Sequence, residues 1–406
     1  MVDTTTEVGK GLFYLYKKFD RIQIGGYIQP QFQVAQQKGI RTYNGGDFAP
    51  QVNNRFMLRR GRIRFDYIRF NKKDQPSVHF VFQFDGTERG VVIRDFWGRI
   101  LENKWQLLSL TAGMFARPFG YEVNLSSSDR ESPERGRMSQ ILMRTERDLG
   151  TMASFDPRNK EHPLHYLKFD AGIFNGQGLT ATNETDSYKD LISRVSLKPY
   201  PVSNSTKISA GISYLNGGLY QNSRFINKVG SGVNKNIFVI DSSISNIGKK
   251  APRLYHGADA QLRIKTAWGY TELRAEYWWG TQTASATNNE TPAVLLNEPY
   301  YIRKFDGAFF YFLQHIINQF HQIGIKYDWF DPNTKLKGST LGQPGSGTNT
   351  GDIKYSTLSV GYNKYFHENL KVMLWYEIVK NERTVLPGFS GDIEDNVFTC
   401  RLQFRF

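Results

Sequence analysis

The last ten residues of the chain, Val397 to Phe406 ("VFTCRLQFRF"), alternate between apolar and polar side chains from Phe398 onward. A period of two is the signature of a β-strand with two unlike faces. Such a strand fits a soluble sandwich, in which the apolar face points to a core. It fits equally well a barrel in a membrane, in which the apolar face meets lipid and the polar face lines a lumen.

The same alternation recurs in many segments, most of them about ten or more residues long. In one of them Ile208, Ala210 and Ile212 oppose Ser209 and Ser213. This length exceeds the usual soluble strand of about 5–6 residues and matches a strand that crosses a bilayer at a tilt. We expect about sixteen strands, near 21–34, 56–70, 77–84, 91–100, 105–116, 147–155, 163–174, 189–199, 205–215, 252–265, 269–281, 301–313, 318–329, 352–364, 368–380 and 396–406.

The connections between these segments alternate in length. Short ones include 71–76, 266–269 and 366–369, and the brief 85–90 is an exception to the alternation. The long ones are 35–55, 117–146, 175–188, 216–251, 282–300, 330–351 and 381–395. An up-and-down membrane barrel sorts its loops in this way, with short periplasmic turns and long outer loops. We therefore predict an all-β, transmembrane antiparallel up-and-down β-barrel over 21–406, preceded by an N-terminal periplasmic segment over 1–20, and a last strand that closes against the first.

Composition agrees with this architecture. The mean hydropathy is −0.49 and no run of 18 or more apolar residues occurs, which excludes membrane-spanning helices. Aromatic residues make up 14% of the chain, and several lie near presumed strand ends, as in the girdles of membrane barrels: Trp105, Trp268, Tyr301, Trp329, Tyr362, Tyr365 and Phe366.

Charge and reactive residues narrow the function. The formal net charge is +14, but the basic residues are spread singly and no nucleic-acid motif occurs, so we expect no nucleic-acid partner. The single cysteine, Cys400, excludes an intramolecular disulfide, and the seven histidines show no ligand spacing. We expect no enzyme chemistry, metal or cofactor. The start, "MVDTTTEVGKG", lacks a basic-then-apolar leader, so we expect the signal peptide to be absent from this chain.

A row of arginines marks the second predicted strand, "FMLRRGRIRFDYIRF". Arg60, Arg62 and Arg64 share its polar face at intervals of about 6.6–6.8 Å. Guanidinium groups fork onto phosphate or carboxylate, so the row attracts anions along a pore or braces an inserted loop through its carboxylates. Further candidates for the lumen wall are Arg117, Arg194, Lys198, Arg263, Lys265, Arg274 and Lys326.

The segment 117–146 is the candidate constriction loop. It is rich in Ser, Arg and Glu and shows no good apolar period. A barrel of about sixteen strands encloses a water-filled lumen, which an inward-folded third loop would narrow. The candidate constriction residues are Glu122, Asp129, Arg130, Glu131, Glu134, Arg135 and Arg137.

Two motifs carry a family resemblance. "GMFARPFGYE" followed by "SSSDRESPERG", together with the upstream "LRRGRIRFDY", resembles the signature of the phosphate-selective porins O and P. The resemblance implies a trimeric, sixteen-stranded channel in the outer membrane of a Gram-negative bacterium, with an arginine ladder at Arg60, Arg62 and Arg64 and lysines at the constriction. From Arg117 to Asp148, however, the chain has no lysine and carries six arginines and six acidic residues, a net charge of zero.

The expected function is an outer-membrane porin that passes small hydrophilic solutes passively and prefers phosphate-like anions. Its expected partners are outer-membrane lipid and lipopolysaccharide, small anionic solutes and two further copies in a homotrimer. The first alternative is an accessory or structural barrel with a plugged lumen in a larger outer-membrane complex. The second is a soluble β-rich carbohydrate-binding protein or hydrolase.

Overall fold

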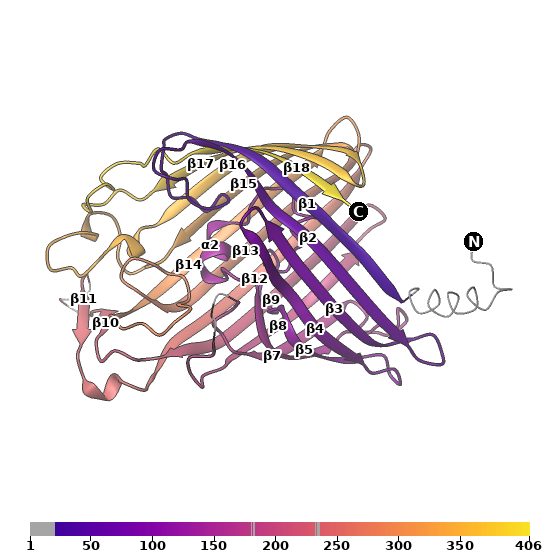
Figure 1. Cartoon of the computed structure of the whole chain (residues 1–406), viewed down its shortest axis with the longest axis horizontal. Coiled ribbons are helices and arrows are strands. Elements are labelled where there is room, and N and C mark those ends of the chain that lie inside the picture. Colours follow the sequence, from indigo (N-terminus) through magenta and orange to yellow (C-terminus); the bar gives the residue numbers. More distant parts are fainter. Residues whose placement is uncertain (1–20, 180, 182, 232, 234–235) are drawn as a thin grey trace.

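The computed structural model describes residues 21–179, 181, 183–231, 233 and 236–406. Sixteen long strands pair in chain order as antiparallel neighbours, and β18 pairs with β1 to close the barrel (Figure 1). The strands are β1 (Ile22–Ala35), β2 (Asn54–Phe70), β3 (Pro76–Thr87), β4 (Gly90–Leu101), β5 (Leu108–Ala116), β6 (Arg147–Phe155), β7 (Leu167–Phe174), β8 (Asp190–Pro201), β9 (Thr206–Tyr220), β12 (Lys250–Thr266), β13 (Gly269–Ala284), β14 (Tyr300–His315), β15 (His321–Asp331), β16 (Tyr355–His367), β17 (Leu370–Asn381) and β18 (Val397–Arg405). The predicted fold class and the closure of last strand on first are confirmed.

Smaller elements lie in the connections. Strands β10 (Ile226–Val229) and β11 (Phe238–Asp241) form a hairpin between β9 and β12, and β10 also pairs in parallel with the start of β14. This hairpin was not predicted. One short helix, α2 (Arg137–Leu142), lies between β5 and β6, and 3₁₀ turns cover Ile244–Asn246, Gly338–Thr340 and Thr350–Asp352. No helix in the described part of the chain is long and apolar enough to span a bilayer.

The alternation of loop lengths places the long connections at one end of the barrel, at the left of Figure 1, and the short turns at the other. The brief 88–89 connection lies at the long-loop end and is the exception expected from the sequence. The predicted N-terminal periplasmic segment, 1–20, lies outside the described residues.

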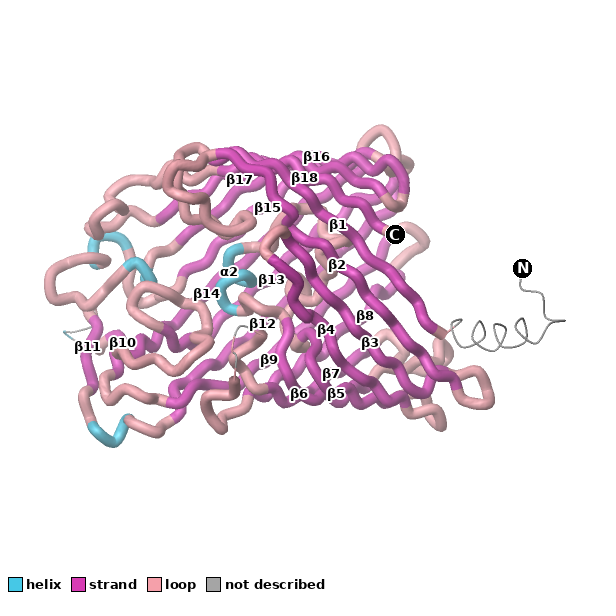
Figure 2. Tube along the Cα trace, viewed as in Figure 1, coloured by secondary structure: helices cyan, strands magenta, loops and turns pink. Residues whose placement is uncertain are grey.

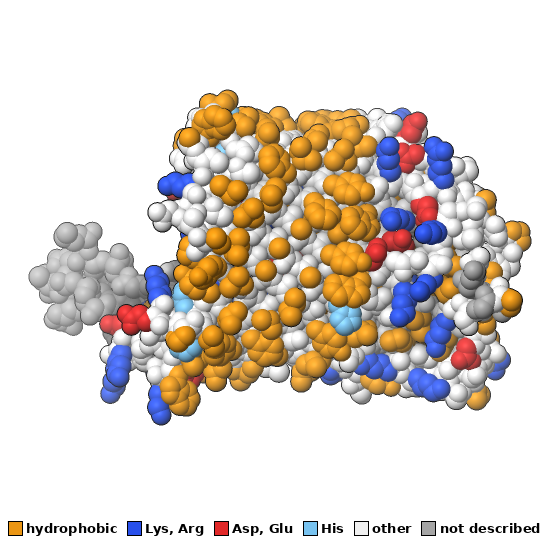
Figure 3. Space-filling view, turned by 180° about the vertical axis from the view of Figure 1, so that it is seen from behind, with side chains coloured by type: hydrophobic (Ala, Val, Ile, Leu, Met, Phe, Trp, Pro, Cys, Tyr) orange, Lys and Arg blue, Asp and Glu red, His pale blue; other side chains and the backbone are white. Residues whose placement is uncertain are grey.

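The two faces of the wall are the reverse of those of a soluble protein. On the outside Ile63, Leu149 and Ile212 are 45%, 51% and 63% exposed, whereas on the inside Arg62 and Gln33 are 4% and 0% exposed. Figure 3 shows the outward hydrophobic side chains as a broad band, with charged side chains gathered beyond its edge. An apolar surface of this extent requires lipid rather than water around it.

Aromatic residues line the border of this band near the long-loop end. The rings of Tyr277 and Trp279 stack with their centroids 5.4 Å apart. The Tyr277 hydroxyl and the Trp329 indole N–H both donate to the Asp306 carboxylate, each at 3.2 Å. At the other end Trp105 and Trp268 lie exposed in short turns. These positions fit interfacial girdles, in which an aromatic ring has one apolar and one hydrated side.

The closing seam is joined by side chains as well as by backbone. Gln29 of β1 donates to the Gln403 side chain of β18 at 2.7 Å, and Gln33 donates to the Thr399 hydroxyl at 3.0 Å. These amides face inward and are buried. The strict alternation at the chain's end thus places Thr399, Arg401 and Gln403 inside the barrel.

Candidate functional site

The connection 117–146 folds into the barrel, where α2 is visible among the surrounding strands (Figure 2). It contacts distant parts of the wall. The Ser127 hydroxyl lies 2.6 Å from the Tyr27 hydroxyl of β1, and the Ser132 hydroxyl lies 2.7 Å from the Tyr311 hydroxyl of β14. Lys371 of β17 donates to the Ser128 carbonyl at 3.1 Å. The predicted inward-folded third loop is confirmed.

Apolar side chains seat this loop against the wall. Phe119 packs edge-on against Trp278 of β13, with ring centroids 4.8 Å apart. Met138, Ile141 and Leu142 of α2 are buried in the same cluster. Their spacing of three and four is a helical period, so the sequence does carry a signal for α2, and the expectation of no apolar period was wrong here.

The entry to the loop has a conformational requirement. Gly120 adopts a φ of 69°, and a Cβ at this position would lie 2.3 Å from the Glu276 carboxylate. Only glycine combines this left-handed backbone with so close an approach. The tight entry lets Glu276 of β13 accept hydrogen bonds from the N–H groups of Tyr121 and Glu122, both at 2.9 Å.

Glu122 holds the loop together from within. Its carboxylate accepts hydrogen bonds from the Gly136 N–H at 3.0 Å and from the Ser139 hydroxyl at 2.7 Å. The neighbouring Arg137 N–H donates to Asp328 of β15 at 3.1 Å. These carboxylates satisfy the N–H groups at the start of α2, which have no partner within the helix.

Glu134 is the main electrostatic anchor of the loop. Three guanidiniums surround its carboxylate: Arg59 at 2.8 Å, Arg60 at 2.8 Å and Arg401 at 2.7 Å. Burial disfavours the charged carboxylate, but these three cations outweigh burial and hold the pKa of Glu134 well below its usual range. The anchor thus joins the loop to β2 and β18, on either side of β1.

Each predicted ladder arginine contacts a carboxylate. Besides the contact of Arg60 with Glu134, Arg62 lies 2.9 Å from Asp85 and also donates to the Ser127 hydroxyl at 2.9 Å. Arg64 lies 2.6 Å from Asp66. The row therefore faces the lumen with its charges paired, which weakens the field that it projects into the pore.

The other predicted residues either contact partners in the lumen or lie toward the short turns. Arg274 lies in the lumen, where two of its nitrogens donate to the Glu131 carboxylate at 2.6 and 2.8 Å. Lys198, Arg263 and Lys265 lie toward the short turns, away from the loop. The remaining contacts are Arg194–Asp259 at 2.6 Å, Lys326–Asp328 at 3.5 Å, Arg405–Asp129 at 3.1 Å, Arg135–Glu146 at 3.2 Å, Arg117 to the Thr145 carbonyl, and Arg137 over the Tyr355 ring at 3.9 Å.

Arg130 differs from the other loop cations. It is buried, and its Nε and Nη1 atoms have no hydrogen-bond partner among the described residues. Burial, with the positive charges of Arg60 and Arg135, lowers its pKa to about 10.

Several charged residues of the wall escaped sequence reasoning, among them Arg94 and Asp95 of β4. The register between β3 and β4 shifts at Gln83/Phe84, and this irregularity places both consecutive side chains toward the lumen. Arg94 reaches Glu146 of the loop at 2.7 Å, and Arg147 reaches Asp95 at 3.1 Å. A period of two cannot predict this, because the bulge breaks the period.

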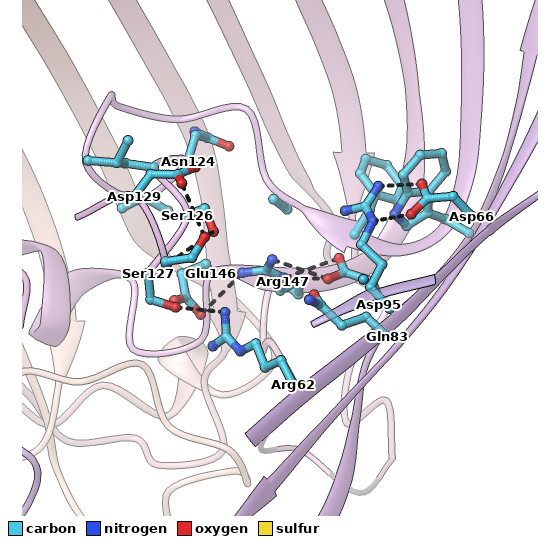
Figure 4. A pocket seen from close by; sticks show the side chains of 18 of the residues that line it. Arg62, Asp66, Gln83, Asp95, Asn124, Ser126, Ser127, Asp129, Glu146 and Arg147 are labelled. Carbon is cyan, nitrogen blue, oxygen red and sulfur yellow. Dashed lines mark hydrogen bonds and ion pairs between the residues drawn. The ribbon is translucent and has the colours of Figure 1, made fainter. Parts of the chain in front are cut away.

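A cavity of about 690 Å³ lies between loop residues 123–129 and the wall. Figure 4 shows Asn124, Ser126 and Asp129 on its loop side and Asp66 and Asp95 on the opposite side. Seven basic and five acidic residues line it, with Ser, Asn and Gln side chains between them. The lining is therefore polar with a small excess of positive charge.

Comparison with known proteins gives structural relatives alone, since no family model and no curated protein matches this chain. The fold is similar to that of the outer membrane channel DcaP of Acinetobacter baumannii, with a TM-score of 0.57 and 10% identity over 95% of this chain and 97% of the other. It is also similar to a loop L8 deletion mutant of OmpT, an outer membrane protein of Vibrio cholerae, with a TM-score of 0.51 and 10% identity over 95% and 99%. In-vitro folded OmpT gives 0.50 and 9% over 95% and 97%. The chain therefore has the fold of outer-membrane channel proteins.

Proposed function

We propose that this chain is an outer-membrane porin through which small hydrophilic solutes diffuse passively. The observation that carries the proposal is the inverted barrel, apolar outside and charged inside, with a loop folded into its lumen. Such a barrel needs lipid around it, and the outer membrane of a Gram-negative bacterium provides it. Lipid and lipopolysaccharide then cover the apolar band, and three copies associate, as the resemblance to phosphate-selective porins implies.

We propose in addition a preference for anions. The support is the excess of basic over acidic residues around the cavity and the net charge of +14 for the chain. Because carboxylates pair Arg60, Arg62 and Arg64, we expect the preference to be modest. The loop also lacks the lysines that the resemblance to phosphate-selective porins implies at the constriction.

Planar-bilayer recording of the purified, folded protein tests this function. We expect defined single-channel steps and, in a KCl gradient, a reversal potential on the anion-selective side. The double variant Arg60→Ala with Arg62→Ala should shift that potential toward cations. An unchanged potential would mean that these arginines only brace the loop.

A plugged accessory barrel is the second candidate, and the packing at the long-loop end favours it. There the fully buried Arg303 of β14 lies 2.8 Å from Asp352, and Asn289 donates to the Gly351 carbonyl at 2.5 Å, so two neighbouring long loops are joined at the rim of the mouth. Absence of conductance from folded protein would favour this candidate over the porin.

A further inference from the structure

The cavity beneath the loop contains one cation unlike the rest. Six of the seven basic residues that line it lie within ion-pair distance of a carboxylate. The pairs are Arg62–Asp85 at 2.9 Å, Arg64–Asp66 at 2.6 Å, Arg147–Asp95 at 3.1 Å, Lys168–Asp170 at 2.8 Å, Arg194–Asp259 at 2.6 Å and Arg405–Asp129 at 3.1 Å. Within the described residues Arg99 alone of the seven has no such partner.

The guanidinium of Arg99 is held in place but not neutralised. Its Nε–H donates to the Thr111 hydroxyl at 2.8 Å, and its central carbon lies 5.0 Å from the centroid of the Trp97 ring. These contacts fix the plane of the group. A guanidinium has five N–H donors, so four remain without an acceptor among the described residues and form a fork for an oxyanion.

A second unsatisfied group lies on the same wall. Asp170 is 4% exposed; its Oδ2 contacts Lys168, while its Oδ1 is buried without a hydrogen-bond partner among the described residues. Arg99 is on β4 and Asp170 on β7, three strand spacings apart, and the register places Arg99 level with Gly172, two residues along β7 from Asp170, so the two backbones are about 16 Å apart. A long arginine side chain and a ligand of a few carbon atoms bridge such a distance. A buried acceptor without a donor is costly, so a ligand hydroxyl is favoured there.

We propose that Arg99 is the solute-binding residue of this cavity and that the solute is a small hydroxylated carboxylate. Its carboxylate takes two parallel N–H···O bonds from Arg99, and a hydroxyl donates to Asp170. This inference rests on the proposed porin function and names the class of solute for it. In this proposal the specificity of the channel comes from Arg99 on β4 rather than from the paired arginine row on β2.

The test uses the folded full chain and gluconate as the probe, with acetate and inorganic phosphate for comparison. Isothermal titration in detergent gives the dissociation constant, and block of the chloride current in bilayers gives it independently. We expect gluconate to bind more tightly than acetate, which has no hydroxyl. Phosphate binding more tightly than gluconate, or acetate equalling it, would overturn the assigned class of ligand.

Arg99→Gln should weaken gluconate binding about tenfold or more, as expected for loss of a charged hydrogen-bonding partner. Arg99→Lys, which keeps the charge but loses the fork, should weaken it by an intermediate factor. Arg405→Gln is the matched comparator, because it removes the same charge from the same cavity but from an exposed ion pair. Equal losses for Arg99→Gln and Arg405→Gln would reduce the effect to general electrostatics and refute the proposal.

The two methods separate this inference from the function on which it rests. Gluconate binding that depends on Arg99 in a protein without conductance would remove the porin function and leave the site. A conducting protein whose gluconate binding does not depend on Arg99 would keep the porin function and refute the site. Heat-modifiable migration on gels, measured for every variant, confirms that each one has folded before it is titrated.

Discussion

Replacement of Glu134 by glutamine should release the loop from the wall. The change removes the charge that three guanidiniums share, and two of these, Arg60 and Arg401, have side chains only 8% and 1% exposed. Breaking a buried ion pair costs about 3–5 kcal/mol, because an uncompensated charge remains. The third, Arg59, is 27% exposed and contributes less, since solvent screens its charge.

The lower end of that range is appropriate because glutamine still accepts one hydrogen bond. A loss of about 3 kcal/mol lowers the ratio of docked to undocked loop about a hundredfold. The rate of tryptic cleavage measures this ratio, because Arg130 and Arg135 are buried in the docked loop and become cleavable only when the loop undocks. We expect cleavage after Arg130 and Arg135 to be about a hundredfold faster than in the parent protein, together with larger single-channel currents; cleavage after Arg144, whose side chain is 62% exposed in the docked loop, does not report on docking.

Asp129→Asn is the matched control. It removes a carboxylate from the same loop, but both Asp129 and its partner Arg405 have side chains 52% exposed. An exposed ion pair is worth about 0–1 kcal/mol, so cleavage should change by no more than about fivefold. The reasoning about the Glu134 anchor fails if Glu134→Gln and Asp129→Asn are cleaved at similar rates, or if neither differs from the parent.

Three further outcomes follow from the structure. The pKa of Glu134 is lower in the folded protein than in the unfolded chain, so the stability that its charge contributes is fully present above the unfolded pKa and is lost as the pH falls through the folded pKa. The conductance ratio of Glu134→Gln to parent should therefore stay constant from about pH 5 to 8. Gly361→Ala should lower the unfolding temperature, because its Cβ would lie 2.1 Å from Trp375, whereas Gly391→Ala, with nothing within 4 Å, should not. Unheated protein should migrate faster than boiled protein on SDS gels; a single mobility would contradict the barrel.

The sequence was sufficient for the architecture, because that information is local. Alternation along a strand states which side chains share a face, and loop length states which end a connection occupies. Sixteen strands and their order followed from these two patterns, whereas the inward loop was expected from its composition, from the lumen of a barrel of this size and from the family resemblance. The ends of strands were less certain: the fifth strand was expected from residue 105 and begins at Leu108.

The partners within the lumen could not be read in this way. Glu134 meets Arg60 and Arg401, which lie 74 and 267 positions away in the chain. Any of the loop's acidic residues could have paired with any arginine of the wall until register and loop path were known. The sequence also could not show which arginine lacks a partner. Arg99 differs from the other cavity cations only because, among the described residues, no carboxylate of another strand comes within ion-pair distance of it in the folded barrel.

The Glu134 anchor also bears on the order in which the molecule is assembled. Two of its cations belong to the second strand, but Arg401 belongs to the last, which is synthesised at the end and completes the cylinder. The loop therefore gains its full hold only after the first and final strands have met. Docking of the loop and closure of the barrel become a single late event in folding, so a chain whose first and last strands have not paired holds its loop only weakly.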